Sequence, residues 1–292
     1  MVEASPAVDS AFVYHRRRRI RPMRIVAYGT LVLLAATWLV PIAVVIMTSL
    51  RSEADFSQNG AISLPSSLTF DSYRRAWDVG HFETIYRNSF LITVIKVPIG
   101  VLIAALCAYA LTKLRLRLAT PMLVILLIGL TVPAYVTLLP IFILLRNLGL
   151  IDTLWGLIPP YVAFGLAFEI LILRAYFRSI PDELIEAARL DGATELGIFF
   201  RIVAPLSLPA LAALCIIDAV GTWNEFLIAL TVLSSEDHFT IPLGLRNFQG
   251  LFTTEHTALN AAILLAIGPL LVLYLVLQRY IVSGLTTGSL KG

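Results

Sequence analysis

Six apolar runs, each about as long as a helix that crosses a lipid bilayer, dominate this sequence of 292 residues. A crossing helix needs roughly 20 apolar residues, because it rises about 1.5 Å per residue through a hydrocarbon layer about 30 Å thick. The runs lie at residues 25–49, 89–111, 121–145, 154–173, 207–233 and 258–280. Charged residues make up only 14% of the chain, against about 25% in soluble domains. The sequence therefore predicts an all-α, polytopic membrane protein with six transmembrane helices.

Lysine and arginine are distributed unevenly between the segments that connect these runs. If the N-terminus is cytoplasmic, the inner segments carry 15 of the 22 basic residues and the outer segments carry 6. Because basic residues stay on the cytoplasmic side, we expect both termini in the cytoplasm of a bacterial or archaeal cell, with the chain in its membrane. The first run is about twice as long as the apolar region of a cleaved signal, so we expect it to remain as an anchor.

The predicted organisation has five parts. They are a basic cytoplasmic segment (1–24), the first transmembrane helix (25–49), an external segment (50–88), a core of five helices (89–281) that includes a long loop (174–206), and a cytoplasmic tail (282–292). Each apolar run contains proline, which removes a backbone donor and bends a helix. Pro133 and Pro140 are seven residues apart and share a helix face, so we consider this pair the candidate for a functional bend.

Residues that would support chemistry on this chain are scarce. Cys107 and Cys215 each lie in an apolar run, which favours packing over a disulfide. The four histidines have no partner at metal-ligand spacing, and the sequence holds neither a phosphate-binding GxxxxGK[ST] loop nor a GxSxG nucleophile motif. Its basic residues form no continuous face for nucleic acid. We therefore expect a non-catalytic protein that holds no metal or cofactor itself and whose chemistry belongs to a partner.

The loop at 174–206 is too long for a simple connection between neighbouring helices. Residues 179–191 predict a short helix that Gly192 closes, and Thr194 predicts the cap of a second, amphipathic helix. Helices this short are marginal alone and need a surface to pack on. The loop carries five acidic and four basic residues, which favours a soluble protein partner over a lipid surface, because lipid-bound helices are usually basic.

Part of this loop, EAARLDGATELGIFFRIVAPLSLPAL, resembles the EAA loop in the permease subunits of ATP-binding-cassette importers. The family pattern is E-A-A, three residues, G, nine residues, then I-x-L-P. The matching positions are Glu186, Ala187, Ala188, Gly192, Ile202 and Pro205. Ala204 departs from the pattern, which has leucine there. The stretches TFDSYRRAW, VPAYVTLLPIF, TWNEF and GLTTGSLKG are similar to segments of the maltose-type carbohydrate permeases, so the resemblance covers residues 68–292.

The resemblance implies a type I importer permease fold in which the loop, hereafter the coupling loop, docks on an ATPase. The residues implied in this coupling are Glu186, Ala187, Ala188, Asp191, Gly192, Leu196 and Phe199. Leu196 and Phe199 are expected on or near the contact face, and the tail at 288–292 is expected near the same ATPase. The implied partners are two ATPase subunits that bind ATP and Mg, a second permease, an extracytoplasmic sugar-binding protein and a sugar.

Four ionisable residues fall inside the predicted helices, namely Lys96, Glu169, Asp218 and Glu225. Each costs roughly 2.5–3.5 kcal/mol at a helix centre, so each needs a partner or water. Lys96 and Glu225 lie at similar depths and could pair, whereas we expect Glu169 to reach the inner membrane surface. Asp218, Asn224 and Glu225 are candidates for the translocation path or for the contact with the second permease, with Lys96 as counter-ion; a buried pair that fixes helix register is the alternative.

Trp223, beside Asn224, offers an aromatic face for a sugar ring. The external segment at 234–257 is too polar to span the membrane and too long for a tight turn. In maltose-type permeases the corresponding loop reaches into the binding protein, so the resemblance implies contacts at Leu243, Gly244, Asn247 and Gly250. Packing of this loop on a neighbouring segment is the alternative.

These expectations together predict the permease subunit of an ATP-driven sugar importer. A membrane-embedded enzyme is the rival hypothesis. It would need carboxylates that converge at one membrane face, but Glu169 and Glu225 are predicted near opposite faces. A scaffold or receptor would leave the spacing of the EAA pattern without an explanation.

Overall fold

The computed structural model describes residues 22–114, 116–250 and 254–287, and the chain divides into two units, residues 1–44 and 45–292. The predicted basic segment therefore lies almost entirely outside the described residues, as do the last five residues of the tail. Helix α1 (Pro22–Ser49) is 28 residues long and keeps Pro41 within it. Its stretch Val26–Ser49 is apolar and long enough to cross a membrane.

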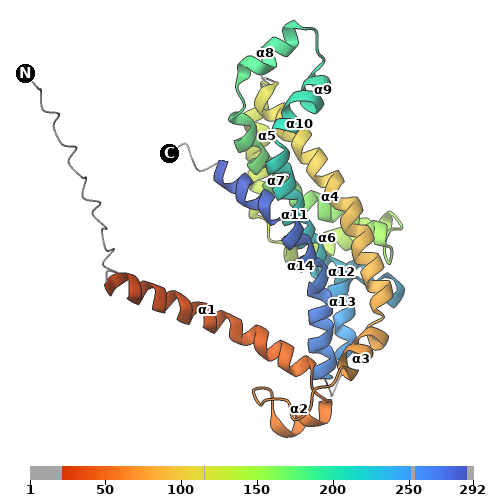
Figure 1. The fold of residues 1–292 in the computed structure, drawn as a ribbon. Coiled ribbons are helices and arrows are strands. Elements are labelled where there is room, and N and C mark those ends of the chain that lie inside the picture. Colours follow the sequence, from red (N-terminus) through yellow and green to blue (C-terminus); the bar gives the residue numbers. More distant parts are fainter. Residues whose placement is uncertain (1–21, 115, 251–253, 288–292) are drawn as a thin grey trace, which may run out of the picture. The chain divides into compact units, whose positions relative to one another are not determined.

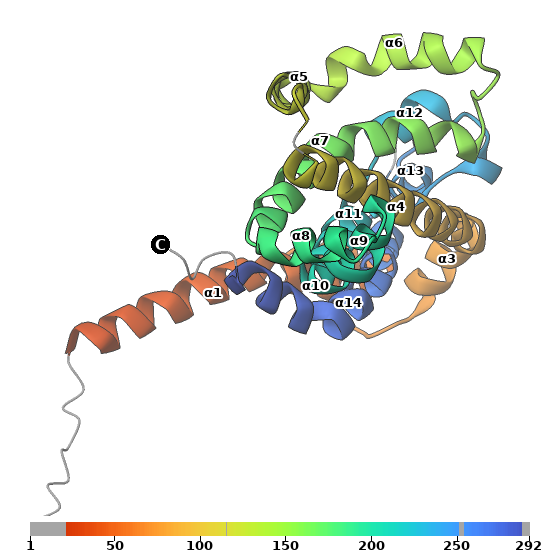
Figure 2. The same cartoon turned by 90° about the horizontal axis from the view of Figure 1, so that it is seen from above.

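Four helices form the bundle of the second unit. They are α4 (Phe82–Lys113), α7 (Ile158–Arg178), α11 (Leu208–Trp223) and α14 (His256–Thr287). Helix α4 packs along α7 and also contacts α11, which in turn packs on α14 (Figures 1 and 2). Ala104, Ala105 and Ala108 are buried on α4, and such small side chains let membrane helices approach closely.

The count of membrane-spanning helices agrees with the prediction. Among the described residues, four helical segments are long and apolar enough to cross a membrane, and two bent pairs of helices raise the number to six if each pair is one span. No β-strand occurs in the described ranges, where the one bridge joins Gln249 to Thr254. The all-α architecture predicted from the sequence is therefore confirmed in the described residues, and the range of four to six candidate spans includes the predicted six.

The third predicted span, 121–145, is not one continuous helix. It divides into α5 (Ala119–Thr131) and α6 (Ala134–Asn147), which meet at an angle of 101°. Val132 is extended, with a ψ of 116°, because the ring of Pro133 disfavours the helical conformation of the residue before it. Pro140 lies inside α6, so the bend that we expected of the two prolines comes at Pro133.

The fifth predicted span, 207–233, is also interrupted. Helix α11 ends at Trp223, and a separate helix α12 (Leu227–Val232) follows after three residues. Two polar residues satisfy the backbone groups at this break: Asn224 donates to Val220 O at 2.9 Å, and the Glu225 carboxylate accepts the N–H groups of Ile228 and Ala229. Apolar character alone did not reveal this interruption.

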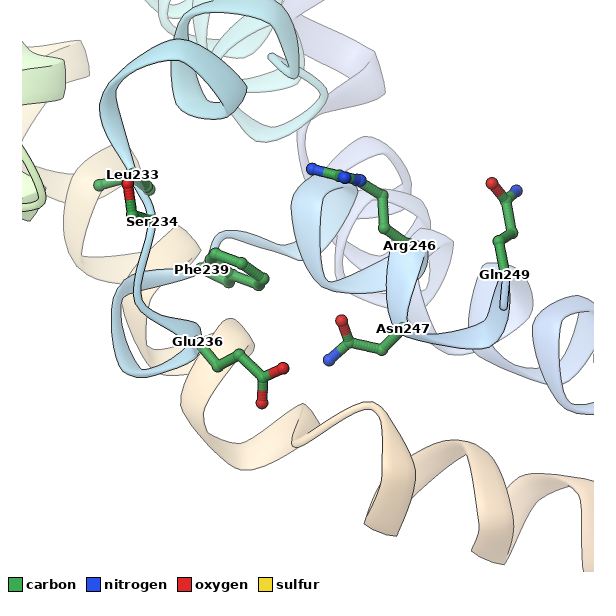
Figure 3. A pocket seen from close by; sticks show the side chains of 7 residues that line it. All are labelled: Leu233, Ser234, Glu236, Phe239, Arg246, Asn247 and Gln249. Carbon is green, nitrogen blue, oxygen red and sulfur yellow. The ribbon is translucent and has the colours of Figure 1, made fainter. Parts of the chain in front are cut away.

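Short elements complete the second unit. They are α2 (Glu53–Asn59), α3 (Asp71–Val79), η1 (Leu154–Leu157), η3 (Glu236–His238), α13 (Ile241–Gly244) and η4 (Leu245–Phe248). Two of them, α2 and α3, lie at the end of the bundle opposite α8 (Asp182–Leu190) (Figure 1). Between η3 and η4 lies an open cavity of about 490 Å³, shown in Figure 3. We call it the outer cavity.

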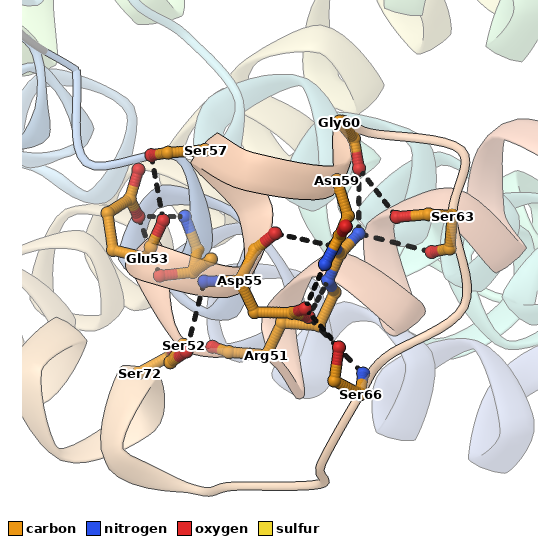
Figure 4. A network of polar contacts seen from close by, with 11 residues as sticks. Arg51, Ser52, Glu53, Asp55, Ser57, Asn59, Gly60, Ser63, Ser66 and Ser72 are labelled. Atoms are coloured by element: carbon orange, nitrogen blue, oxygen red, sulfur yellow. Dashed lines mark hydrogen bonds and ion pairs between the residues drawn. The ribbon is translucent and has the colours of Figure 1, made fainter.

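Arg51 organises the polar segment that follows α1 (Figure 4). Its side chain is fully buried and donates to Asp55 Oδ2 at 2.6 Å and to the carbonyl oxygens of Asp55, Gly60 and Ser63. Hydrogen bonds from Ser66 and Arg51 hold the pKa of Asp55 well below its usual value. Glu53 of α2 accepts the amide of Thr257 at 3.0 Å, which fixes α2 to the first turn of α14.

We expect the substitution Arg51→Ala to lower the melting temperature of the detergent-solubilised protein by about 5 °C or more, because three carbonyl groups lose a charged donor. Arg74→Ala is the matched control, since Arg74 is an exposed arginine on α3. Differential scanning fluorimetry would measure both. Equal melting temperatures for the two variants would contradict a stabilising role for Arg51.

Candidate functional site

The coupling loop folds into two short helical segments, as the sequence predicts. Helix α8 (Asp182–Leu190) begins after Pro181, and Gly192 follows it with a φ of +81°, a conformation that favours glycine. The second segment comprises α9 (Glu195–Ile198), the π-helical turn η2 (Phe199–Val203) and α10 (Ala204–Leu206). Thr194 caps it by accepting the amide of Gly197 at 3.2 Å.

One face of the second segment is part of the hydrophobic core. Ile198, Phe199 and Val203 are buried, and the rings of Phe199 and Tyr109 of α4 lie 5.5 Å apart between centroids. The surface position that we expected for Phe199 is therefore wrong. Its neighbour Phe200 points outward instead and was missed, because the two adjacent phenylalanines cannot be assigned to faces across a π-helical turn.

The coupling loop also exposes large apolar side chains. Leu190 is 89% exposed, Leu196 is 63% exposed, and Leu184 and Phe200 are about half exposed. These residues come from both helical segments. Apolar side chains gathered on a short element are typical of a protein contact surface. We call Leu184, Leu190, Leu196 and Phe200 the docking face.

Charged hydrogen bonds connect the coupling loop to the end of α4. Lys113 donates to Asp182 Oδ1 at 2.6 Å and to Ile180 O at 2.7 Å, and Arg189 donates to Lys113 O at 3.1 Å. Glu195 accepts from Arg189 at 2.7 Å and from the Tyr109 hydroxyl at 2.7 Å. The Arg189 guanidinium and, second, Tyr109 lower the pKa of Glu195.

We call Tyr109, Lys113, Arg189 and Glu195 the α4 link. The sequence gives no local signal for it, because its bonds to α4 join residues far apart in the chain, 86 positions for Tyr109 and Glu195 and 76 for Lys113 and Arg189. It makes the coupling loop and α4 a connected unit through both charge and packing. A force applied to the docking face therefore has a short route into the membrane helices.

Three ionisable side chains meet inside the bundle. Lys96 Nζ of α4 forms an ion pair with Asp218 of α11, and lies 3.9 Å from Glu169 Oε1 of α7. Lys96 and Glu169 are each 2% exposed. We call these three residues the ionic triad. It joins the three helices that pack closely in the core.

Glu169 does not reach the membrane surface as we expected. Gly165, one turn earlier on α7, has no side chain and leaves room for the Glu169 carboxylate. A Cβ atom at Gly165 would lie 2.6 Å from Glu169 Oε1. Depth along the helix predicted escape to the surface, but the absence of a side chain at Gly165 leaves room for the carboxylate to turn inward toward Lys96. Neither oxygen of Glu169 accepts a hydrogen bond from any residue that the structure describes.

Glu225 has partners other than the one we expected. Its carboxylate accepts from the Tyr161 hydroxyl at 2.6 Å and from two amides at the start of α12. The proposed pairing of Lys96 with Glu225 is therefore wrong, and Asp218 takes that place. Tyr161 gave no signal in the sequence, because its partner is 64 residues away.

A cavity of about 310 Å³ lies beside the ionic triad. Its lining residues are Lys96, Ala134, Tyr161, Phe164, Gly165, Asp218, Gly221, Thr222, Glu225 and Ile228. We call it the triad cavity. The sequence suggested five residues for the translocation path. Three of them, Lys96, Asp218 and Glu225, lie around this one cavity.

The other two, Trp223 and Asn224, are not among its lining residues. Trp223 is 6% exposed and donates its indole N–H to Ala266 O of α14 at 3.1 Å. Its ring is therefore occupied in packing between α11 and α14, which corrects its expected role as a sugar platform. Asn224 is exposed and caps the end of α11.

The loop at 234–257, which was predicted to be external, places its predicted contact residues at different depths. Leu243 and Gly244 are buried, and a Cβ atom at Gly244 would lie 2.9 Å from Ile85. Asn247 lines the outer cavity with Leu233, Ser234, Glu236, Phe239, Arg246 and Gln249 (Figure 3). Gly250 is exposed. Surface contact through Leu243 and Gly244 is therefore excluded, whereas Asn247 and Gly250 are accessible.

Metal ligation has no support in the described ranges, where no three His, Cys, Asp or Glu side chains are placed to hold an ion. The arrangement instead combines an exposed apolar surface at one end of the bundle, charged groups inside it and a polar cavity at the other end. These features suit the movement of a polar solute, driven from outside the chain.

Comparison with known proteins gives consistent results. A family model described as "Binding-protein-dependent transport system inner membrane component" matches residues 97–287. "Probable ABC transporter permease protein YurM" of Bacillus subtilis is 37% identical over 252 residues, which cover 86% of this chain and 83% of that protein. "Sulfoquinovosyl glycerol transport system permease protein SmoH" of Agrobacterium fabrum is 32% identical over 291 residues, covering 100% of this chain and 99% of that protein.

A solved structure shares the fold over nearly the whole chain. It belongs to a bacterial ABC transporter involved in the import of the acidic polysaccharide alginate. The matching chain is 29% identical, with a TM-score of 0.78, and the match covers 94% of this chain and 99% of that one.

Proposed function

We propose a function from one premise: this chain belongs to the family of binding-protein-dependent transport system inner membrane components. It is a membrane-spanning ABC transporter permease, as the EAA pattern predicted. We infer that it carries a sugar or a related carbohydrate, which an extracytoplasmic binding protein delivers. The similarity to the sulfoquinovosyl glycerol permease SmoH and to a transporter that imports alginate supports a carbohydrate substrate.

The docking face supports the proposal that this chain is coupled to an ATPase. It lies on the segment with the EAA pattern, and its two most exposed leucines would be covered by a soluble partner. In the proposed assembly, two ATPase subunits bind ATP and Mg and hydrolyse ATP, while this chain does no chemistry. The coupling loop and both termini are cytoplasmic. Glu186, Ala187, Ala188, Asp191 and Gly192 shape the helix that the ATPase grips.

A second permease completes the proposed translocation path. We place the triad cavity on this path, so that Lys96, Asp218 and Glu225 line it. The membrane core of the chain remains residues 89–281, with 1–24 and 282–292 as cytoplasmic flanks and 50–88 outside. ATP-driven closure of the ATPase pair would move the coupling loops and favour the outward-facing arrangement, and hydrolysis would favour the inward-facing one.

At the external end, the binding protein would meet the rim of the outer cavity. Asn247 and Gly250 are accessible there. Leu243 and Gly244 are buried and pack the loop onto the bundle. Asp152 holds the other side of this rim, because its carboxylate accepts the amides of Ser234 and Ser235 at 2.9 Å. A loop fixed at both ends keeps its shape when a partner binds.

Co-purification tests the proposed function. The chain, expressed with the ATPase and second permease from its own operon or genome, should hold both in detergent. The ATPase rate should rise several-fold when a sugar-loaded binding protein is added. A chain that purifies without an ATPase, or a complex whose rate does not respond to any loaded binding protein, would overturn the proposal.

We expect the substitution Tyr109→Phe in the α4 link to reduce the sugar transported per ATP hydrolysed by a few-fold. It removes the hydroxyl that binds Glu195 but keeps the ring that packs on Phe199. Transport and ATPase rates would be measured in the same proteoliposomes. Tyr135→Phe is the control, because Tyr135 is 69% exposed. An unchanged transport ratio for Tyr109→Phe would show that the hydroxyl does not transmit movement.

A further inference from the structure

The triad cavity is large enough to hold part of a carbohydrate. Its volume of about 310 Å³ lies at the lower end of the range for small-molecule sites, which is about 300–1,000 Å³. Five helices and the break after α11 surround it. Its lining residues come from α4, α6, α7, α11 and α12, and from Glu225 between the last two. Such a break supplies polar backbone and side chains at membrane depth, where they line a cavity.

The lining combines the groups that a sugar requires. Carboxylates accept hydrogen bonds from sugar hydroxyls, an ammonium group donates to them, and a threonine hydroxyl can do both. Asp218, Glu225, Lys96 and Thr222 supply these groups, and the ring of Phe164 offers an apolar face. Gly165 and Gly221 leave the wall without side chains at two positions, so a ring could approach the backbone.

Hydrogen-bond acceptors in this site exceed the donors that the chain supplies. The Asp218 side chain is 10% exposed, and its Oδ2 atom has no hydrogen-bond partner among the described residues, although Oδ1 binds Lys96. A buried acceptor without a donor costs roughly 1–3 kcal/mol, so a sugar hydroxyl that reached the Asp218 carboxylate would be favoured.

The charge of the site is also unbalanced. In the cavity wall, the two carboxylates of Asp218 and Glu225 stand against the ammonium group of Lys96. The Glu225 carboxylate accepts hydrogen bonds from two amides and a tyrosine hydroxyl. An anionic sugar in the cavity would therefore face a net negative charge. Repulsion between like charges is strong there, because the surroundings are of low polarity.

We propose that the triad cavity is a subsite for a neutral sugar and that it rejects uronic and other acidic sugars. This inference rests on the proposed transport function and adds to it a substrate class and a direct contact by this subunit. The proposed substrate class differs from that of the similar solved transporter, which imports an acidic polysaccharide. Asp218 and Thr222 are the residues that contact the sugar, and Glu169 holds Lys96 and Asp218 in position.

Direct binding to the complete permease–ATPase complex in nanodiscs, without the binding protein, tests the proposal. The probes are trehalose and melibiose as neutral disaccharides and cellobiouronic acid as an acidic one, followed by saturation-transfer difference NMR. We expect the two neutral sugars to bind and the acidic sugar not to bind. Thr222→Val should weaken neutral-sugar binding about 3- to 10-fold, because one hydrogen bond is lost.

Thr231→Val is the matched control, because the Thr231 hydroxyl donates to Leu227 O of its own helix and Thr231 is outside the cavity lining. Asp218→Asn removes one charge and should increase the binding of cellobiouronic acid. Three results would overturn the proposal: no binding of either neutral sugar, equal binding of neutral and acidic sugars, or equal losses in Thr222→Val and Thr231→Val. The ATPase response of the same complex to loaded binding protein tests the transport function separately.

Discussion

Replacing Lys96 with methionine is expected to prevent most of the protein from folding into the membrane. Lys96 is 2% exposed and is the counter-charge of Asp218 and Glu169 within the ionic triad. Methionine would leave two buried carboxylates side by side without a cation. Breaking a buried pair in this way costs roughly 3–5 kcal/mol, a large part of a total stability of about 5–15 kcal/mol. The yield of monodisperse protein after size-exclusion chromatography measures the effect.

The rescue experiment separates charge from packing. Adding Asp218→Asn and Glu169→Gln to Lys96→Met removes both uncompensated charges while keeping similar side-chain volumes. We expect this triple variant to recover most of the folded yield, since neutral replacements of a buried ionic cluster are often tolerated. If Lys96→Met alone folds as well as the wild type, the ionic triad is not a structural element. If the triple variant does not recover, volume rather than charge explains the loss.

The triad shows where sequence analysis reached its limit. Lys96, Asp218 and Glu225 were singled out correctly as intramembrane polar residues, because ionisable side chains in apolar runs need partners. Their pairing could not be derived, since depth along a helix does not say which way a side chain faces. Lys96 and Glu225 matched in depth, but rotation of α11 places Asp218 toward α4. Glu169 faces inward because Gly165 leaves space for its carboxylate, and this contact is visible only in the three-dimensional structure.

The coupling loop was predicted more completely because its signals are local. Gly192 and Thr194 mark a turn and a cap that depend on adjacent residues, and both behave as expected. Apolar length likewise sufficed to find the spans. The break at Pro133 was expected from the proline pair, but the one after Trp223 was missed, because hydropathy is averaged over about 19 residues and cannot register two adjacent polar positions. Long-range bonds such as Tyr109 to Glu195 leave no pattern in one sequence.

The second large effect is expected at the docking face. In the double variant Leu190→Glu and Leu196→Glu, we expect the ATPase to bind at least about 30-fold more weakly, which corresponds to roughly 2 kcal/mol for a pair of central contact residues. Both leucines are exposed, so the change should leave the fold intact. Two further carboxylates would also have to be buried without partners if the ATPase covered them. Titration of the purified ATPase against the permease in nanodiscs measures the affinity.

Leu148→Glu is the control for this variant. Leu148 is 61% exposed and follows α6, in the segment that the charge distribution assigns to the outer side, so an ATPase on the cytoplasmic side could not reach it. Equal weakening by both changes would point to a general effect of added negative charge, and an unchanged affinity of the double variant would show that the ATPase binds elsewhere. Loss of affinity in the double variant alone requires that the leucines of the coupling loop form the contact and that this loop faces the cytoplasm. One binding curve and its control thereby test the coupling surface and the orientation of the chain together.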